Sequence, residues 1–588
     1  MAEENSESRV PLPLAAVLER LKLPEGGPGV EETLGRVNVQ PRVLQEFRPL
    51  SESLEWDLSD LQWAAAGLLP FVENEVPYTI NNNSRLSENA AEVLFASCLE
   101  TPPGEKIRLL DLGAGTGLFA RYLLDVFRAR CRQEGKDFYD RLTFYVSDRS
   151  PATVRQWRER GVFADHGEHA ALGACDALHA AEFRPPEGGP VELSGLRAVF
   201  ANYVLDSLPA TVIRRGEHGC DELCVRIHLT DETPRLKKYT RLGLDGLRGL
   251  AASKDAAERA RLIPLVSLFE FETAFMPNGS PPPYAEEALA FGIGLERIVL
   301  NHGAFRCLEA CDALLEPGGF LLVNDYGPVQ PEQIPAQAAT QRFGPSMALG
   351  VNFPLLQHHF GGLGRLVVKP DEDDPRSIHA RLILRSRLPG AIEAFQKQFG
   401  PQAYRETEGS QEEARQHLEA GRLEKAMECY KRAVARCPRD WRLLGEVAEF
   451  LIRRAADYAA GLELASAAVK LNPWYSAWLW NVLGDSLFAL ERYEEAHEAY
   501  LQAQRIDPKD VRTNLNLAYS YAEFGQYGEA LEAAAAGLAA DGAGVYRERL
   551  IEKQQQILAG IAGKWRSEQE WLARRASRMA VDAQRAKQ

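Results

Sequence analysis

The residues with the clearest chemical potential are an aspartate and three glycines within residues 107–117. An apolar run with the length of a buried strand ends at Asp111, and Gly113, Gly115 and Gly117 follow in a G-x-G-x-G pattern. Glycine adopts positive φ angles at no steric cost and lets a ligand approach the backbone closely. The spacing differs from the G-x-G-x-x-G of dinucleotide-binding turns. The segment therefore predicts a cofactor-binding turn of another kind.

A second acid stands at the end of the next predicted strand. Apolar residues over 118–127 recur at helical spacing, so the glycine turn joins a strand to a helix. Residues 142–148 then predict a strand that ends at Asp148. Carboxylate oxygens accept hydrogen bonds from both hydroxyls of a ribose, which makes Asp148 the predicted ribose acid. A plain surface acid is the alternative, since Asp148 follows Gly113 by more than the ~20 residues usual in dinucleotide folds.

Further strand patterns predict an open α/β sheet with polar residues at its strand ends. Residues 196–202 and 320–325 suit a fourth and a fifth strand, and residues 365–369 and 379–385 suit two final ones. Ligands of such sheets bind at the carboxyl ends of the strands. The turn after a weaker third strand either meets the adenine amino group or is an ordinary polar turn. Candidate site residues at these ends are Asp176, Ala177, Asn202 and Asp206.

Five motifs in order give a specific resemblance to a known family. They are D-L-G-A-G-T-G at 111–117, D-R-S-P at 148–151, A-N-Y-V-L-D-S-L-P at 201–209, N-D-Y-G at 324–327 and G-V-N-F at 350–353. Together they resemble the MidA family of class I S-adenosylmethionine (SAM) methyltransferases, over roughly residues 75–385. One member of that family methylates a protein arginine. The resemblance implies SAM as cofactor and a doubly wound, Rossmann-like sheet.

The resemblance also implies site roles. The predicted SAM-binding residues are Arg85, Asp111, Gly113, Gly115, Gly117, Asp148, Asp176, Ala177 and Asn202. Arg85 is either a partner of the SAM carboxylate or a solvated loop residue. Asp206 and Asn202 are the predicted catalytic residues. Asp206 would orient a protonated acceptor, with Glu270 or Glu272 as further carboxylates; a helix N-terminal acid is the structural alternative for Asp206.

Two positions depart from the family pattern. Tyr203 stands where the family usually has a glutamate, and Thr116 stands where arginine is frequent. Arginine specificity is therefore open at this point. Residues 1–75 predict an N-terminal entry segment and helical cap, and residues 76–385 the methyltransferase domain. An insertion at about 210–313 would supply substrate walls or a lid, or else a structural cap.

The C-terminal third carries a helical repeat. Pro438, Pro473 and Pro508 are each 35 residues apart, and the intervening sequence fits the tetratricopeptide (TPR) pattern. We expect a linker at 386–409 and an all-α TPR solenoid at 410–580, capped by a last helix from about residue 545. Stacked helix pairs present a concave groove suited to a protein or peptide partner. Self-association through the solenoid is the alternative. A chain ending near Ser386 is expected to keep SAM binding.

Composition narrows the function classes. A net charge of −15 and a pI of about 5.4 argue against a nucleic-acid partner, because phosphate binding needs a basic face. Nine cysteines with scattered spacing fit a reducing compartment. Cys220 and Cys224, like Cys307 and Cys311, are four residues apart, but neither pair has a second pair at zinc-finger spacing. No apolar run approaches ~18 residues, so no membrane span is expected. The acidic start shows no signal peptide, which favours a cytoplasmic protein.

The sequence thus predicts a SAM-dependent methyltransferase that acts on a protein or peptide recruited through the TPR repeats. Two alternatives remain: a small-molecule methyltransferase, and a TPR scaffold with a vestigial methyltransferase domain.

Overall fold

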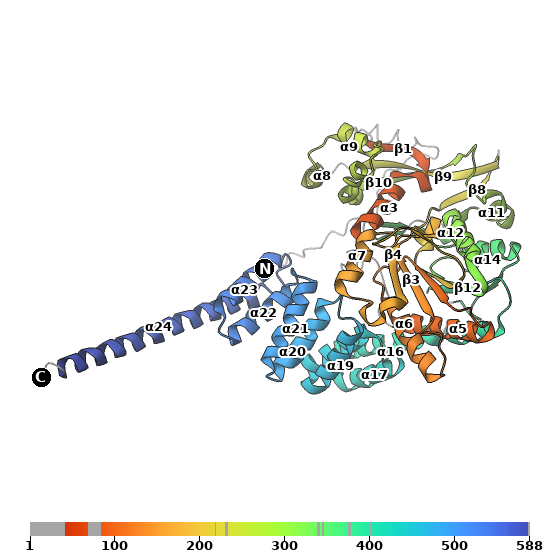
Figure 1. Ribbon diagram of the computed structural model, residues 1–588. Coiled ribbons are helices and arrows are strands. Elements are labelled where there is room, and N and C mark those ends of the chain that lie inside the picture. Colours follow the sequence, from red (N-terminus) through yellow and green to blue (C-terminus); the bar gives the residue numbers. More distant parts are fainter. Residues whose placement is uncertain are drawn as a thin grey trace, which may run out of the picture.

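The computed structural model describes residues 42–68, 84–217, 219–229, 233–337, 341–343, 346–373, 378–399 and 402–585. It contains a large central sheet between helices, a smaller antiparallel sheet beside it, and a helical solenoid that ends in a long projecting helix (Figure 1). The predicted entry segment at residues 1–30 lies outside the described residues.

The central sheet has seven strands in the order β15-β16-β12-β7-β2-β3-β4. Its strands are β2 (Ile107–Leu112), β3 (Leu142–Asp148), β4 (Ala170–Ala174), β7 (Leu196–Asn202), β12 (Leu315–Asp325), β15 (Leu366–Val368) and β16 (His379–Leu384). The strands from β4 to β12 run parallel, whereas β16 is antiparallel to β12 and to β15. The order switches direction between β2 and β7, which opens a crevice at their carboxyl ends. The predicted strands and the doubly wound fold are confirmed.

Helices cover both faces of this sheet. Along β2, Leu109 packs into the core on one face and Leu110 into the core on the other, as strand alternation requires. The first face is covered by α5 (Arg85–Glu100), α6 (Leu118–Gln133), α7 (Pro151–Arg160) and α15 (Pro389–Phe399), and the second by α11 (Ala285–Phe291), α12 (His302–Ala313) and α14 (Phe353–Gly362). Short strands β5 (Glu182–Phe183) and β6 (Val191–Glu192) form a separate hairpin.

The predicted linker at 386–409 is wrong. Helix α15 lies there, and Ala391, Phe395 and Phe399 bury one of its faces in the core beside α5. The Gly390 backbone N–H also donates to Glu100 Oε2 at 2.9 Å. The four-residue spacing of these apolar side chains was the overlooked signal, because it gives a helix one buried face.

The second sheet lies over the carboxyl edge of the central one. It consists of β1 (Val43–Pro49), β8 (Thr211–Gly216), β9 (Gly219–Leu229), β10 (Phe269–Pro277) and β11 (Ile298–Leu300), with β9 between β1 and β8. Around it lie α3 (Leu54–Ala66), α8 (Thr233–Tyr239), α9 (Leu244–Ala251), α10 (Ala256–Ala260), α13 (Ile334–Gln337), β13 (Gln341–Phe343) and β14 (Ser346–Ala348). The predicted helical cap is therefore only partly helical, because β1 pairs with β9 of the insertion.

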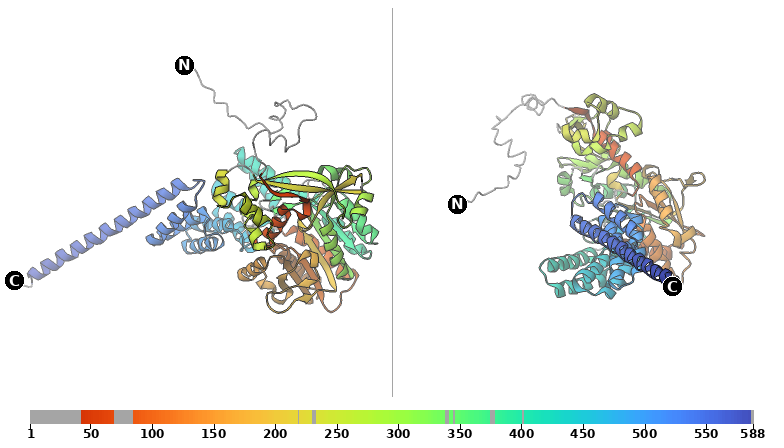
Figure 2. Two further views of the ribbon diagram at one scale, coloured as in Figure 1. Left: turned by 90° about the horizontal axis from the view of Figure 1, so that it is seen from above. Right: turned by 90° about the vertical axis from the view of Figure 1, so that its left-hand side faces the viewer.

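The solenoid consists of four helix pairs and a final helix. They are α16 (Gln402–Glu419) with α17 (Leu423–Arg436), α18 (Trp441–Phe450) with α19 (Tyr458–Leu471), α20 (Ala477–Ala489) with α21 (Tyr493–Ile506), α22 (Val511–Glu523) with α23 (Tyr527–Ala540), and α24 (Arg547–Arg585). Small residues permit close packing: a Cβ on Gly484 would lie 2.4 Å from the Tyr500 ring. Leu550 and Ile557 bury the start of α24 against the last pair, and the rest of α24 projects away (Figures 1 and 2).

The first repeats share a core with the central domain. Trp441, Leu444 and Leu479 belong to the same buried cluster as the apolar faces of α5 and α6. Across this contact the Tyr122 hydroxyl donates to the Leu471 carbonyl at 3.0 Å. The repeats are therefore packed against the methyltransferase region along α6.

Candidate active site

A cavity of about 700 Å³ lies at the crevice between β2 and β7, a volume typical of small-molecule sites. We call it the central cavity. Its floor is formed by the carboxyl ends of the central strands, and its roof by α3 and the start of the second sheet. Trp56 of α3 and Met347 of β14 are among the apolar residues that line the cavity. The predicted site residues that line it are Asp111, Gly113, Gly115, Asp148, Ala177, Asn202 and Asp206.

The glycine turn needs its glycines for two different reasons. Gly113 and Gly115 have φ angles of 61° and 53°, which favour glycine, and both line the central cavity. A Cβ on Gly113 would lie 2.6 Å from Val204 Cγ2, so no larger residue fits there. Gly117 begins α6 and does not line the cavity, and a Cβ on it would lie 3.1 Å from the Phe163 ring. Gly117 thus has a packing role in the structure, and its contact with SAM stays a prediction.

Asp148 is fixed against the glycine turn. Its Oδ2 accepts a hydrogen bond from the Gly115 N–H at 3.1 Å, and its Oδ1 accepts one from the Ser150 N–H at 2.9 Å. Burial raises the pKa of Asp148 to about 6, although these two backbone donors favour the charged form. The carboxylate thus stands at the cavity wall where the sequence predicts a ribose acid.

Two buried polar groups in the cavity wall lack partners within the described chain. Both carboxylate oxygens of Asp111 and the Nδ2 of Asn202 make no hydrogen bond, while Asn202 Oδ1 accepts one from Asn324 Nδ2 at 2.8 Å. Burial, and then the neighbouring Asp148, raise the pKa of Asp111 well above its usual range. An ammonium group of a ligand would donate to Asp111, and a carboxylate of the same ligand would accept from Asn202 Nδ2. A further positive charge on the ligand would suit the buried acids. SAM has all three, so the residues present fit it.

Asp206 lines the cavity and forms a buried acid pair with Asp325. Asp325 Oδ2 accepts from the backbone N–H groups of Leu205 at 3.0 Å and Asp206 at 3.3 Å. Burial raises the pKa of Asp206 to about 7. Burial and the Asp206 carboxylate together raise the pKa of Asp325 well above its usual range. Sequence reasoning missed Asp325, although its place at the end of the strand beside β7 was a usable signal.

Tyr203 occupies a strained backbone position at the cavity wall. Its φ is 55°, which costs a non-glycine residue of this size of the order of 1–3 kcal/mol. The ring lies 4.7 Å from that of Tyr326, and both rings line the cavity. The residue that departs from the family pattern therefore contributes an aromatic wall beside Asn202 and Asp206.

Several predicted residues lie elsewhere. Arg85 begins α5 and its Nη1 is 3.8 Å from Cys437 Sγ of the solenoid, so it does not reach the cavity. The Asp176 carboxylate accepts from the Leu178 N–H at 3.0 Å and does not line the cavity, because it caps a short turn. Glu270 and Glu272 lie on β10 outside the cavity wall, and Glu272 bonds His228 at 3.0 Å.

The solenoid supplies one residue to the glycine turn. The Tyr475 hydroxyl, from the loop between α19 and α20, donates to the Thr116 carbonyl at 2.6 Å, and both residues are buried. On the other side of the turn, Trp157 Nε1 donates to the Gly115 carbonyl at 2.9 Å. The turn that lines the cavity is thus held between α7 and the second TPR repeat.

Among the described residues, no group of three or more metal-ligating side chains is present. The helices in that part of the chain also include none that is long and apolar enough to cross a membrane.

An open sheet of this strand order, with one reversed strand, a glycine turn and acids at the strand ends, has the class I methyltransferase fold. Residues 91–350 match the profile of a family described as "Putative S-adenosyl-L-methionine-dependent methyltransferase", and residues 484–525 match a TPR repeat profile. Residues 91–350 belong to a SAM-dependent methyltransferase domain with SAM as its cofactor, and TPR repeats follow this domain. The resemblance found in the sequence is confirmed.

Solved structures and curated relatives resemble parts of the chain. A Burkholderia thailandensis protein bound to S-adenosyl-homocysteine is 16% identical, over 67% of this chain and 92% of that one, with a TM-score of 0.36. A TPR protein of Thermus thermophilus is 18% identical, over 26% and 82%, with a TM-score of 0.23. The peroxisomal targeting signal receptor of Candida glabrata is 42% identical over 71 residues, and the chain spans 12% of its length.

Proposed function

We propose that this methyltransferase modifies a nitrogen of a protein side chain, with arginine as the first candidate, and that the TPR groove holds the acceptor protein. The single observation that carries the proposal is Asp206. It lines the central cavity beside Asn202, and burial raises its pKa to about 7. A group with that pKa is matched to proton transfer near neutral pH. A protonated guanidinium acceptor needs such a carboxylate to orient it and to receive its proton.

The acids and tyrosines of the cavity wall then have defined tasks. SAM, when bound, supplies a methyl group already activated by its sulfonium. Asp148, fixed by Gly115 and Ser150, accepts hydrogen bonds from a ribose, and Asp111 accepts from a cationic amine. Asp206 takes the proton that the acceptor nitrogen loses, and the roof over the cavity excludes water. The Tyr203 and Tyr326 rings present π faces suited to a cation.

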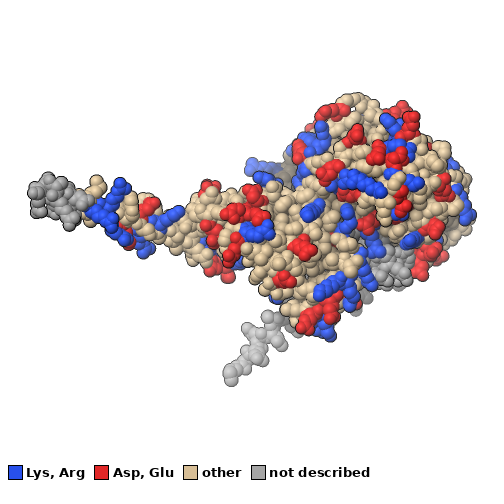
Figure 3. Space-filling model, turned by 60° about the horizontal axis from the view of Figure 1, so that its bottom comes forward, with Lys and Arg blue, Asp and Glu red and all other residues tan. Residues whose placement is uncertain are grey.

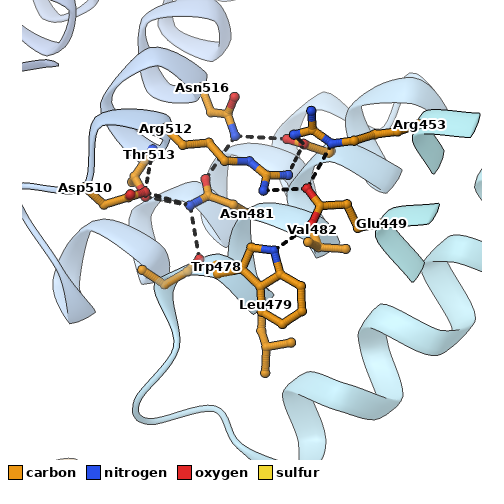
Figure 4. A network of polar contacts seen from close by, with 12 residues as sticks. Glu449, Arg453, Trp478, Leu479, Asn481, Val482, Asp510, Arg512, Thr513 and Asn516 are labelled. Atoms are coloured by element: carbon orange, nitrogen blue, oxygen red, sulfur yellow. Dashed lines mark hydrogen bonds and ion pairs between the residues drawn. The ribbon is translucent and has the colours of Figure 1, made fainter. Parts of the chain in front are cut away.

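The solenoid offers a polar groove for the acceptor protein. Helices α18, α20 and α22 pack against one another in succession, so the first helix of each pair lines the inside of the curve. A connected network covers this side (Figure 4): Arg512 joins Glu449 and Asp485, at 2.8 Å each, and Asn516 Nδ2 donates to Asn481 Oδ1 at 2.9 Å. Asn481 is fully buried in this network, whereas the side chains of Arg453, Glu449 and Asp485 are 48%, 27% and 22% exposed. These three charges are the ones available to a bound peptide.

We also propose a cytoplasmic location, which the cysteines support. All nine are buried and none forms a disulfide, as a reducing compartment would keep them.

The test is to incubate the full chain with methyl-labelled SAM and a cell extract, then to separate proteins from small molecules. We expect label on protein, lost in Asp206→Asn. Arg453→Glu, which reverses a half-exposed groove charge beside Glu449, should weaken acceptor labelling without changing SAM affinity. Arg505→Glu, on the outer helix α21, is the matched control. Label confined to small molecules, at equal rates in Arg453→Glu and the unmodified chain, would contradict a protein acceptor.

A further inference from the structure

Helix α24 extends well beyond the solenoid that it caps. Its start is anchored by buried Leu550 and Ile557, and Lys564 Nζ lies 5.2 Å over the Tyr527 ring. From Trp565 onward, no described residue outside α24 makes a hydrogen bond, ion pair or ring contact with it. The outer part therefore projects alone (Figure 2). In proteins most of the stability of a helix comes from the packing of an apolar face, so the sequence of this outer part should show what packs against it.

An apolar seam runs along this outer part. It consists of Ala562, Trp565, Gln569, Leu572, Ala576 and Met579, which are alternately three and four residues apart. That alternation keeps the seam on one side of the helix, as in a coiled coil. The large members are strongly exposed: Trp565 by 65%, Leu572 by 57% and Met579 by 66%. In a soluble chain, a continuous exposed stripe of this kind marks an interface.

We infer that the occupant of this seam is the same helix of a second copy, in antiparallel orientation. The seam alternates a small or polar residue with a large one along its whole length. In an antiparallel pair, each layer places a small or polar residue of one helix against a large residue of the other. Trp565 then faces Ala576 of the partner copy, Leu572 faces Gln569, and Met579 faces Ala562. Every layer holds one large and one smaller side chain, which gives an even packing density.

A parallel pair would pack this seam poorly. Identical residues would face one another, so Trp565 would meet Trp565 of the partner copy, while Ala576 would meet only Ala576. The layers would alternate between overfilled and empty, and both conditions destabilise a core. The volumes along the seam thus select the antiparallel arrangement.

Charges beside the seam favour the same arrangement. With the layers aligned as above, Glu568 of one helix lies beside Arg575 of the other, and symmetry repeats the pair. Arg575 lies over the Trp571 ring, 5.1 Å from its centroid, at the side of the seam. Lys and Arg side chains are visible along the outer helix (Figure 3). The antiparallel dimer also sends the two catalytic bodies to opposite ends of the paired helices, so they do not collide.

Sedimentation equilibrium of the full chain across the micromolar range tests the pairing. We expect a monomer–dimer equilibrium, with a dissociation constant raised at least about tenfold by Trp565→Ala, the scale for losing a large buried apolar side chain. Arg574→Ala is the control, since the Arg574 side chain is 76% exposed on the same helix and pairs with Glu570 off the seam. It should leave the dissociation constant unchanged. A chain that stays monomeric, or equal effects of the two changes, would overturn the proposal.

A charge-swap experiment tests the orientation. Glu568→Arg and Arg575→Glu should each weaken the dimer, because each places like charges side by side across the helix pair. The double variant should restore it, since the antiparallel alignment again pairs opposite charges. SAM binding serves as the folding control, because these residues lie far from the central cavity. A double variant no tighter than either single one would exclude the antiparallel alignment.

Discussion

Replacement of Tyr475 by phenylalanine tests whether the solenoid helps to shape the cofactor turn. The change removes one hydroxyl and keeps the ring, so the packing of the shared core is preserved. Thr116 is only 2% exposed, and its carbonyl then loses the Tyr475 hydroxyl that donates to it at 2.6 Å. Leaving such a group buried and unpaired costs about 1–3 kcal/mol. Because the adjacent Gly115 lines the central cavity, we expect part of this cost to appear as weaker SAM binding.

The assay is titration calorimetry with SAM, and about 1.4 kcal/mol would appear as a tenfold rise in the dissociation constant. Tyr122→Phe is the matched control. It removes a hydrogen bond of 3.0 Å across the same domain contact, from Tyr122 to the Leu471 carbonyl, but away from the glycine turn. We expect it to lower the melting temperature with little change in SAM affinity. If the two variants weakened SAM binding equally, the specific role of Tyr475 would be refuted.

Other predictions follow from the same geometry. Methyl transfer should rise with pH through about 7 as Asp206 loses its proton, and Asp206→Asn should be slower by roughly 10²–10⁴-fold with a flat profile, measured as initial rates. The raised pKa of Asp206 means that its stability contribution is lost as pH rises through about 7, so Asp206→Asn should melt at a higher temperature at pH 8. Asp148→Ala should weaken SAM binding by about 1.5–3 kcal/mol in calorimetry; unchanged affinity would place the ribose acid elsewhere. A chain ending near Ser386 should lose SAM affinity, because the truncation exposes the core under α6. This is the opposite of the expectation from the sequence. Full affinity in a folded truncated chain would show that SAM binding does not depend on the core shared with the solenoid.

Local patterns were enough to predict the central sheet and much of the site. The strand that ends at Asp111, the glycine turn and Asp148 are close in sequence or sit at equivalent strand ends, so topology brings them together. Strand β1 was missed because its partner β9 is contributed by the distant insertion. The contact between Tyr475 and Thr116 joins residues 359 positions apart, so no local sequence pattern predicts it.

The acid pair illustrates a different limit. The sequence places Asp206 after one strand and Asp325 at the end of another, and the adjacency of these strands follows from the fold. Their raised pKa values depend on burial and on their mutual proximity, which only the folded structure defines. Helix α15, in contrast, could have been predicted from the sequence, because its buried apolar residues recur at helical spacing, yet a linker was predicted in its place.

If SAM binds in the cavity at the glycine turn, a large side chain on that turn must abolish binding, and calorimetry on Gly115→Arg measures this. Gly115 has a φ of 53° and lines the cavity, so an arginine there places its side chain in the cofactor space. Gly135→Arg is the control, because Gly135 has a similar φ of 61°, is exposed, and has nothing within 4 Å of an added Cβ. We predict that Gly135→Arg binds SAM as the unmodified chain does and that folded Gly115→Arg binds none. Unchanged SAM affinity in folded Gly115→Arg would show that SAM binds elsewhere.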